Sequence, residues 1–284
     1  MKQSVFVISV IFLIAFKAAA QKSKSIDWQT DYRKAQALSR ETGKPLLLDF
    51  TAVWCKPCKI MDEQFWVRAD IVETMKSFVA VKLDYDKERS LAGRFSVRGI
   101  PYVAFVDPIG NLITYRNGFG TKKANELSEI FNEMPKDFSP LKKAYDAIEL
   151  KKNDGLPLLQ IADFYRTAGM LVLSNDYYRR ANRTYEVNKD AERRELITAV
   201  VGLNFYAVRD YKQANESLED YLKIFPSGKY EEIATAALAV GCANLNKFKE
   251  AERYMEILKT KFPASKSLET ATKIVEDVKN KIKR

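Results

Sequence analysis

Histidine is absent from this chain of 284 residues, and cysteine is scarce. Without an imidazole, the chain itself cannot form a Ser/His/Asp or Cys/His catalytic arrangement or bind a metal ion through histidine. The three cysteines stand at positions 55, 58 and 242, which is too few for a disulfide framework. Two of them are close together and the third stands apart, which favours a reactive pair over a structural crosslink.

Long hydrophobic runs are missing too, apart from one at the N-terminus. That run extends from Val5 to Phe16 without a charge, and Lys17 and then three alanines follow it up to Ala20. It is too short to cross a bilayer comfortably and matches the hydrophobic part of a secretory signal. We predict that residues 1–20 are a signal peptide and that the protein is exported. The periplasm is the expected compartment, with secretion or an uncleaved signal anchor as alternatives, and disulfides can persist there.

The charge balance is basic, with 47 Lys and Arg residues against 37 Asp and Glu, a formal net charge of +10. The basic residues are scattered among acidic ones, and no arginine-rich run or nucleic-acid motif is present. The pattern indicates a solvated basic surface, and we expect no nucleic-acid partner.

The first half of the chain alternates short apolar runs with helical periodicity. The order is typical of βαβ units followed by a hairpin, with the turn at residues 108–111. We therefore predict an α/β fold with a mixed sheet flanked by helices on both faces. The pattern predicts helices over residues 26–42, 55–65, 70–77, 89–95 and 121–132, and strands over 45–50, 78–85, 101–107 and 112–116.

The second half has a different character, since no convincing strand follows residue 141. Residues 205–226 align with residues 242–263 at an offset of 37, and a weaker copy covers residues 176–185. The copies share an aromatic residue and an alanine three positions later, and both long copies end in proline. This pattern resembles tetratricopeptide repeats, in which helix pairs stack on their neighbours.

We therefore predict an all-α helical-repeat domain behind the α/β domain. The predicted organisation is a signal peptide over residues 1–20, an α/β domain over 25–134, a linker over 135–140 and a helical-repeat domain over 141–284.

The pair Cys55 and Cys58 can be a redox dithiol, half of a zinc site or a structural crosslink. Zinc prefers four ligands, and the chain has three cysteines and no histidine. A crosslink across so short a loop would restrict the unfolded chain little. Cys55 follows a buried strand and should open a helix, whose N-terminal amides stabilise a thiolate. Cys58, one turn later and less exposed, could then resolve a mixed disulfide, while Pro57 suits the helix start.

Two stretches resemble thioredoxins. Residues 49–59 read Asp-Phe-Thr-Ala-Val-Trp-Cys-Lys-Pro-Cys-Lys, like the thioredoxin active site, and residues 97–101 read Val-Arg-Gly-Ile-Pro, like its second active-site loop. Gly110 and Gly118 also stand where the family has glycines, and the likeness covers roughly residues 27–133. The resemblance implies a thioredoxin fold and redox chemistry without a cofactor or metal.

The resemblance also implies roles for individual residues. A cis peptide bond is expected between Ile100 and Pro101, packed on the cysteine pair. Asp49 matches the family's buried acid, whose raised pKa would let it help deprotonate Cys58. The catalytic residues would be Cys55, Cys58, Asp49 and Lys82, and the substrate-binding residues Trp54, Lys56, Pro57, Ile100, Pro101 and Tyr102.

Two positions depart from the usual thioredoxin pattern. Lys56 stands where thioredoxins usually have glycine, and Tyr102 follows the proline where they usually have threonine. A positive charge at Lys56 should stabilise the Cys55 thiolate and make the pair somewhat more oxidising. The third cysteine, Cys242, lies on an apolar helical face beside Val240, which predicts a buried small side chain.

These observations lead to two hypotheses. The first is a thiol–disulfide oxidoreductase acting outside the cytoplasm, which reduces protein disulfides and receives electrons from a membrane or soluble thiol donor. In this hypothesis the helical repeats bind a peptide or protein partner. The alternative is a protein-binding scaffold in which the repeats carry the function and the thioredoxin-like domain is a redox-sensitive platform.

Overall fold

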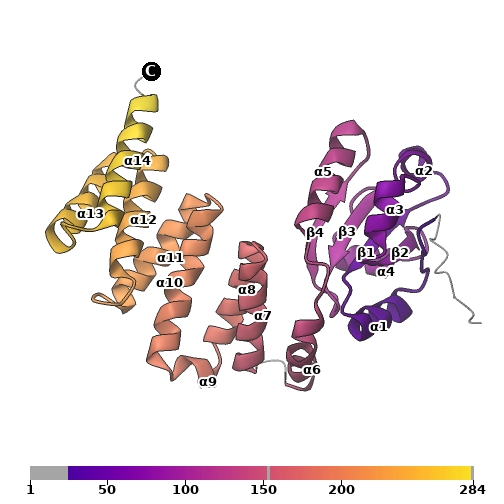
Figure 1. Ribbon diagram of the computed structural model, residues 1–284, viewed down its shortest axis with the longest axis horizontal. Helices are drawn as coiled ribbons and strands as arrows, with labels where there is room; N and C mark the ends of the chain where they lie inside the picture. The colour runs from indigo at the N-terminus through magenta and orange to yellow at the C-terminus, as the bar shows by residue number, and fades with distance from the viewer. Residues whose placement is uncertain (1–24, 152–153, 283–284) are drawn as a thin grey trace, which may run out of the picture.

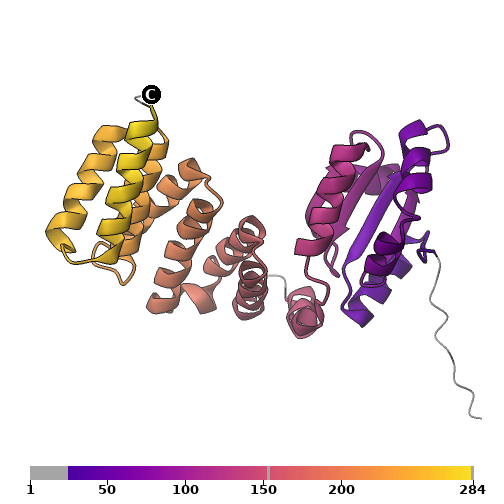
Figure 2. The same ribbon diagram turned by 45° about the horizontal axis from the view of Figure 1, so that its top comes forward.

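A computed structural model describes residues 25–151 and 154–282 of the protein. The predicted signal peptide over residues 1–20 lies outside the described residues. We call residues 25–134 the sheet region and residues 141–282 the helical region. Figures 1 and 2 show the two regions as two arms that rise from a common base.

The sheet has four strands in the order β2-β1-β3-β4. β1 pairs in parallel with β2 and antiparallel with β3, and β3 pairs antiparallel with β4. All the residues of β3 and all but the last of β1 are buried, as expected for the two central strands of a covered sheet. The strands are β1 (Leu46–Thr51), β2 (Val79–Asp84), β3 (Tyr102–Val106) and β4 (Leu112–Asn117).

Helices cover both faces of this sheet, which confirms the predicted mixed α/β architecture. Leu47 faces a cluster that includes buried residues of α2, α3 and α5, whereas its neighbours Leu46 and Leu48 face residues of α1 and α4. This division follows from the two-residue period of a strand. The helices are α1 (Tyr32–Thr42), α2 (Lys56–Gln64), α3 (Ala69–Met75), α4 (Arg89–Arg94) and α5 (Thr121–Glu133).

The predicted first helix over residues 26–42 begins later than its periodicity suggests. Gln29 is bridged to β2 instead, since its N–H donates to the Ala80 carbonyl at 2.8 Å. Asp31 then caps α1, because its side chain accepts hydrogen bonds from the first backbone amides of the helix. The apolar Trp28 that suggested a longer helix packs against the α2 and α3 cluster.

The helical region contains no strand among its described residues. Successive helices pack as antiparallel pairs, and the two aligned segments end in the second helices of two such pairs, α11 and α13. The helices are α6 (Lys142–Leu150), α7 (Gly155–Thr167), α8 (Leu171–Asn182), α9 (Tyr185–Asn188), α10 (Ala191–Ala207), α11 (Tyr211–Ile224), α12 (Glu231–Asn244), α13 (Phe248–Lys261) and α14 (Lys266–Ile282).

Two glycines allow close contact between these paired helices. A Cβ atom at Gly202 in α10 would lie 2.6 Å from the Leu218 side chain of α11. A Cβ atom at Gly241 in α12 would lie 2.1 Å from Asn215 Oδ1. Neither distance is possible between real atoms, so a larger side chain at either position would displace the facing Leu218 or Asn215 side chain.

The two regions meet at the end of the sheet where β3 turns into β4. Phe138 lies in the segment over residues 135–140 that we predicted as a linker, yet its side chain is buried, and its N–H donates to the Gly43 carbonyl at 2.7 Å. Ile109 and Ile113 of the sheet region pack against the core of the helical region. The arms therefore share one continuous core at their base.

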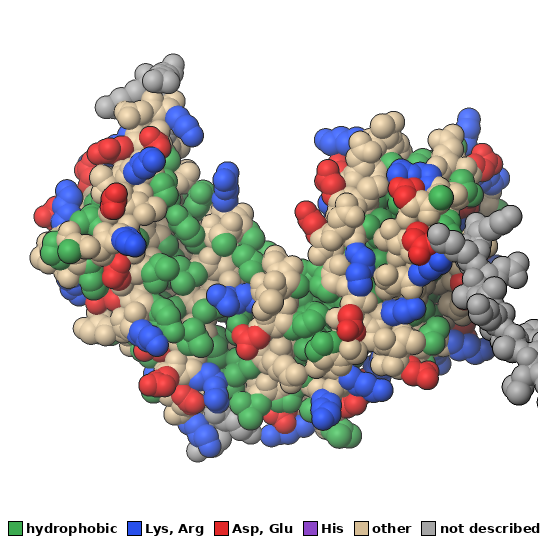
Figure 3. All heavy atoms as spheres, viewed as in Figure 1, with side chains coloured by type: hydrophobic (Ala, Val, Ile, Leu, Met, Phe, Trp, Pro, Cys, Tyr) green, Lys and Arg blue, Asp and Glu red, His purple; other side chains and the backbone are tan. Residues whose placement is uncertain are grey.

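A hollow separates the arms above this base, and Figure 3 shows hydrophobic side chains gathered on its floor. A groove at this position is lined by residues of β4, α5 and the start of α8, among them Ile113, Ile130 and Val172. Within the described parts of the chain, no helix combines the length and the apolar character that crossing a membrane requires.

Candidate active site

Cys55 and Cys58 form a disulfide at the start of α2. Cys55 is the N-cap residue, and its sulfur accepts a hydrogen bond from the Cys58 backbone N–H at 3.3 Å. Pro57 lies in the first turn, where its missing N–H costs no helical hydrogen bond. The expected difference in exposure is not present in the disulfide form, because Cys55 is 2% and Cys58 3% exposed.

A second loop closes over the disulfide. The peptide bond between Ile100 and Pro101 is cis, as the resemblance implied. Ile100 packs against Ala52 and both cysteines, and this contact helps to bury the two sulfur atoms. The 97–101 loop and the start of α2 are thus the two borders of the site.

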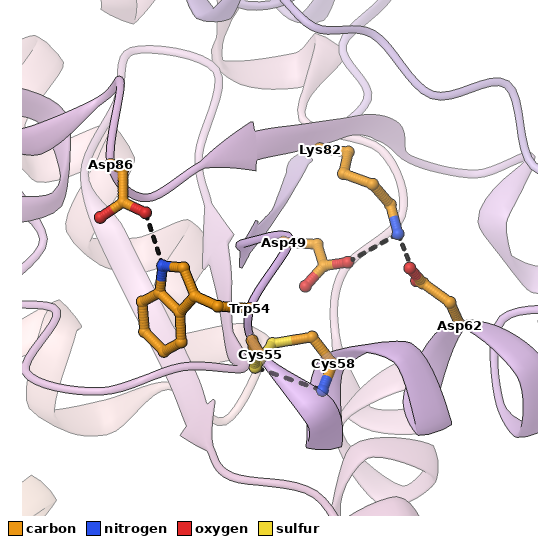
Figure 4. The surroundings of a disulfide bond; sticks show 7 residues. All are labelled: Asp49, Trp54, Cys55, Cys58, Asp62, Lys82 and Asp86. Atoms are coloured by element: carbon orange, nitrogen blue, oxygen red, sulfur yellow. Dashed lines mark hydrogen bonds and ion pairs between the residues drawn. A yellow bond between two sulfur atoms is a disulfide. The ribbon is translucent and has the colours of Figure 1, made fainter.

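A buried carboxylate lies behind the disulfide. Asp49 of β1 is 2% exposed and stands opposite Lys82 in the parallel register of β1 and β2. The Lys82 ammonium group lies 3.2 Å from Asp49 Oδ2 and also pairs with Asp62 of α2. Figure 4 shows Lys82 between the two carboxylates, with Asp49 next to the cysteine pair. The Lys82 ammonium group also lies 4.7 Å from the centre of the Trp28 ring.

This environment raises the pKa of the Asp49 carboxyl group to about 6. Burial is the largest cause, because it penalises the charged carboxylate. The positive charge of Lys82 lowers the pKa, and the negative charge of Asp62 raises it. Asp49 can therefore take up or release a proton close to neutral pH.

The surface next to the disulfide is partly apolar. Trp54 is 62% exposed, and its indole N–H donates to Asp86 Oδ2 at 2.6 Å, which fixes the ring orientation. Val53 is 78% exposed beside it. Lys56 and Pro57 are also exposed, at the first turn of α2.

Tyr102 differs from its expected placement. Its side chain is 2% exposed, and its hydroxyl donates to the Phe95 carbonyl at 2.9 Å within the core on the α1 and α4 face. Pro101 and Tyr102 are consecutive at the start of a strand, so their side chains point to opposite faces of the sheet. The side chain of Tyr102 therefore does not reach the surface beside the disulfide, and its assignment to substrate contact is wrong in that respect.

Two functional candidates were missed from the sequence. Asp62 stands seven residues after Cys55, a spacing that places both on one side of a helix and could have been noticed. Asp86 follows β2, and its contact with Trp54 depends on how two loops meet, so no local pattern indicates it.

The third cysteine lies far from this site in the sequence and is not part of the disulfide. Cys242 is buried in the helical region, where its sulfur accepts a hydrogen bond from Asn215 Nδ2 at 3.3 Å. Burial raises the pKa of its thiol, which disfavours the reactive thiolate. Across the described residues, no three Cys, Asp or Glu side chains are grouped so that they could hold a metal ion.

Comparison with known proteins supports this geometry. A family model described as thioredoxin-like matches residues 27–108. A thioredoxin of Mycoplasmoides gallisepticum is 35% identical over 89 residues, which are 31% of this chain and 83% of the relative. Thioredoxin Y2 of Arabidopsis thaliana is 36% identical over 94 residues, 32% of this chain and 52% of the relative.

Longer and structural relatives show a weaker likeness. The thiol:disulfide interchange protein DsbD of Campylobacter jejuni is 27% identical over 94 residues, which are 32% of this chain and 17% of that protein. A solved structure titled DsbH oxidoreductase has a TM-score of 0.35 at 21% identity, and the match covers 39% of this chain and 85% of that one. Taken with the buried cysteine pair at a helix start and its cis-proline loop, the sequence matches show that this chain belongs to the thioredoxin-like family and that its sheet region is a thiol–disulfide oxidoreductase domain.

Proposed function

We propose that the protein reduces protein disulfides outside the cytoplasm. The Cys55 thiolate attacks one sulfur of a substrate disulfide, forming a mixed disulfide and releasing the other substrate sulfur as a thiolate. The Cys58 thiolate then attacks Cys55, which frees the second substrate thiol. The substrate gains two electrons and two protons, and Cys55 and Cys58 become the disulfide seen in the structure. A thiol donor restores the dithiol by the reverse exchange.

The placement of Asp49 carries this proposal. A carboxyl group with a pKa of about 6, buried behind the disulfide, is suited to accept the Cys58 proton in the second step. Lys82 stabilises the carboxylate form of Asp49, which is the form able to accept this proton, and Asp49 becomes neutral when it does so. Asp49 and Lys82 are in this way proposed to act in proton transfer.

The remaining site residues are proposed to prepare the nucleophile and to receive the substrate. The N-terminal amides of α2 and the charge of Lys56 favour the Cys55 thiolate. Ile100 packs against the cysteine pair, and we propose that it contacts the substrate chain together with its sequence neighbour Pro101 and with Trp54 and Pro57, which flank Cys55 in the sequence.

The location outside the cytoplasm rests on the hydrophobic run within residues 1–20 and on the relationship to a thiol:disulfide interchange protein. An exported reductase needs an electron supply, so we propose a membrane or soluble thiol protein as its donor. We also propose a thioredoxin-like domain over residues 25–134, a packed connection over 135–140 and a helical-repeat domain from residue 141 onward.

An insulin-reduction assay tests the activity. Cys55→Ser should lower the rate at least about a hundredfold, because the attacking thiolate is lost. Cys242→Ser is the matched control and should leave the rate unchanged, since that thiol is buried in the helical region. Equal, negligible activity of the wild type and the Cys55→Ser variant would contradict the proposal.

The direction of electron flow is a separate measurement. A reductase should show a reduction potential between about −270 and −200 mV against glutathione. A value near about −120 mV would instead indicate an oxidase.

A second function, partner binding, is favoured by the helical region. We propose that its paired helices are tetratricopeptide-like and bind a protein through an open, mostly apolar groove of ≈ 410 Å³ between α10, α12 and α14. Ile233 lines this groove and is 47% exposed. In the full-length Cys58→Ser variant, Ile233→Asp should weaken trapping of the natural partner as a mixed disulfide. Ile224→Asp, at a 54% exposed position of α11 outside the groove, is the control.

A further inference from the structure

Three cations belong to the two segments that border the cysteine pair and have no carboxylate partner. Lys56, Lys59 and Arg98 are all exposed. Within the described residues, none of them forms an ion pair or a side-chain hydrogen bond, whereas Lys82, Arg89 and Arg116 of the same region are paired with carboxylates. We call these three residues the cationic rim.

The rim lies on both borders of the site. Lys56 follows Cys55 and Lys59 follows Cys58, so both belong to the first turns of α2. Arg98 belongs to the second loop, two residues before Ile100, which packs on the disulfide. A substrate whose disulfide reaches Cys55 would lie between these two segments, so its flanking residues would come near the rim.

The nearby carboxylates neutralise the rim only in part, because Lys82 and Arg89 already pair with them. Asp62 pairs with Lys82, which in turn also pairs with buried Asp49. Asp86 accepts the Trp54 indole N–H and pairs with Arg89. Because these carboxylates already have partners, positive charge is in excess beside the cysteine pair.

Glu63, one turn beyond Lys59 on α2, offsets one positive charge of the rim and leaves the rim cations in excess. It is exposed and forms no ion pair with Lys59 within the described structure. Val53 and Trp54 add an exposed apolar contact beside the charges. Opposite charges brought together at the edge of an apolar contact are screened less than charges in open water.

We propose that the cationic rim selects disulfides whose cysteines are flanked by Asp or Glu. The inference rests on the proposed function and names the substrate class of the same site. The chemistry is unchanged: the peptide disulfide is reduced to two thiols while the Cys55–Cys58 dithiol is oxidised. Selection arises because like charges raise, and opposite charges lower, the free energy of the encounter before exchange.

The test compares three disulfide-bonded peptides that have the same loop but carry Glu-Glu, Ser-Ser or Lys-Lys next to the cysteines. The pre-reduced, full-length protein is mixed with each in a stopped-flow instrument, and each rate is divided by the rate with a small neutral dithiol. This division removes the intrinsic reactivity of each peptide. At about 20 mM ionic strength the acidic peptide should react about tenfold faster than the basic one. In 0.5 M NaCl the ratio should fall to about twofold, since salt screens the charges.

Charge reversal on the rim supplies the matched comparison. Lys59→Glu combined with Arg98→Glu should reduce the acidic-to-basic ratio to one or below. Lys212→Glu combined with Lys249→Glu changes the net charge equally on exposed positions of α11 and α13 and should preserve the ratio. Because the ratio compares two peptides on one protein, a changed thiolate pKa cancels.

The outcomes separate the two proposals. If the wild type fails to reduce even the Ser-Ser peptide, the proposed function is overturned. If it reduces that peptide but treats the acidic and basic peptides alike at low salt, the proposed function stands and the selectivity is overturned. Loss of the ratio in the Lys212 and Lys249 variant but not in the rim variant would likewise overturn the role of the rim.

Discussion

Two buried carboxylates at opposite ends of the sheet region have different surroundings. Asp49 lies in β1 next to the disulfide, and Asp107 follows β3 at the end where the helical region packs. They are 2% and 0% exposed, and burial raises the pKa of both carboxyl groups. Their chemical type and burial are therefore alike, and the difference lies in their partners.

Asp107 is satisfied by uncharged donors. It accepts hydrogen bonds from the backbone N–H groups of Ile109 and Asn111 at 3.1 and 2.8 Å. The Asn111 side chain and the hydroxyl of Tyr165 in α7 donate to it at 2.9 and 2.8 Å. Asp107 and its four hydrogen bonds, which we call the joint, connect the turn between β3 and β4 to the helical region.

Asp49 has one charged partner, which it shares. The Lys82 ammonium group pairs with Asp49 at 3.2 Å and also with Asp62. A carboxylate whose charge depends on one shared cation can change its protonation state without breaking a fixed network. The comparison teaches that the hydrogen-bond partners, and not burial alone, separate a structural acid from one able to transfer protons.

The strongest test of the comparison removes the structural acid. Asp107→Ala leaves several buried donors without an acceptor and should lower the free energy of unfolding by about 4 kcal/mol. Urea unfolding of the oxidised protein measures the change. Asp146→Ala removes an exposed carboxyl group of α6 and should change the stability by less than about 0.5 kcal/mol. An Asp107→Ala variant as stable as this control would show that the joint contributes little.

Replacing Asp49, in contrast, should raise the free energy of unfolding. With a pKa of about 6 in the folded protein and 3.8 as its ordinary value, Asp49 binds its proton more tightly when folded. Stability from this group therefore falls as the pH rises from about 4 to 6. Asp49→Asn should raise the free energy of unfolding at pH 8 by up to about 3 kcal/mol, and the gain should shrink as the pH falls below 6. Urea unfolding at several pH values measures it, and a gain independent of pH would point to better packing instead of a removed charge.

A conservative substitution can remove a single hydrogen bond from the joint. Tyr165→Phe removes one donor from Asp107 while keeping the ring, which stacks on Tyr177 with centroids 5.6 Å apart. The expected loss of stability is about 1–2 kcal/mol. Tyr115→Phe, at a 49% exposed position of β4, should have almost no effect and is the control. Equal effects of the two variants would remove Tyr165 from the joint.

The smallest effects are expected for substitutions that shift the pKa of Asp49. Asp62→Asn should lower the pKa of Asp49, because it removes a negative charge, whereas Lys82→Met should raise it. The pKa of Asp49 should fall by about one unit or less in Asp62→Asn. It should rise by somewhat more than this in Lys82→Met. NMR titration of the Asp49 carboxyl carbon measures both. Shifts in the same direction would contradict the idea that Lys82 is shared between two carboxylates.

Much of this molecule follows from local sequence patterns. The strands of the sheet region were predictable because they are short apolar runs between segments with helical periodicity or turn residues. The cis bond before Pro101 and the buried Asp49 were predictable from family resemblance. The start of α1 was not, since Gln29 bonds to β2, a contact between residues distant in the chain. Tyr102 was misplaced for a different reason: the likeness to thioredoxins assigned it to the substrate surface, whereas its side chain points to the core, where it donates to the Phe95 carbonyl.

The sequence by itself determined the reactive pair, the chemistry it can perform and the change from a sheet to paired helices. Those properties depend on residue type and on neighbours within one or two turns. Only the tertiary structure decided that Lys82 is shared with Asp62, that Asp107 receives the Tyr165 hydroxyl and that the rim cations lack acidic partners. These contacts join residues 20 to 58 positions apart, and their energies depend on burial and on which groups converge in space. No local sequence pattern predicts these contacts. The sequence therefore identifies the redox-active cysteines, whereas the fold sets the electrostatic environment around them.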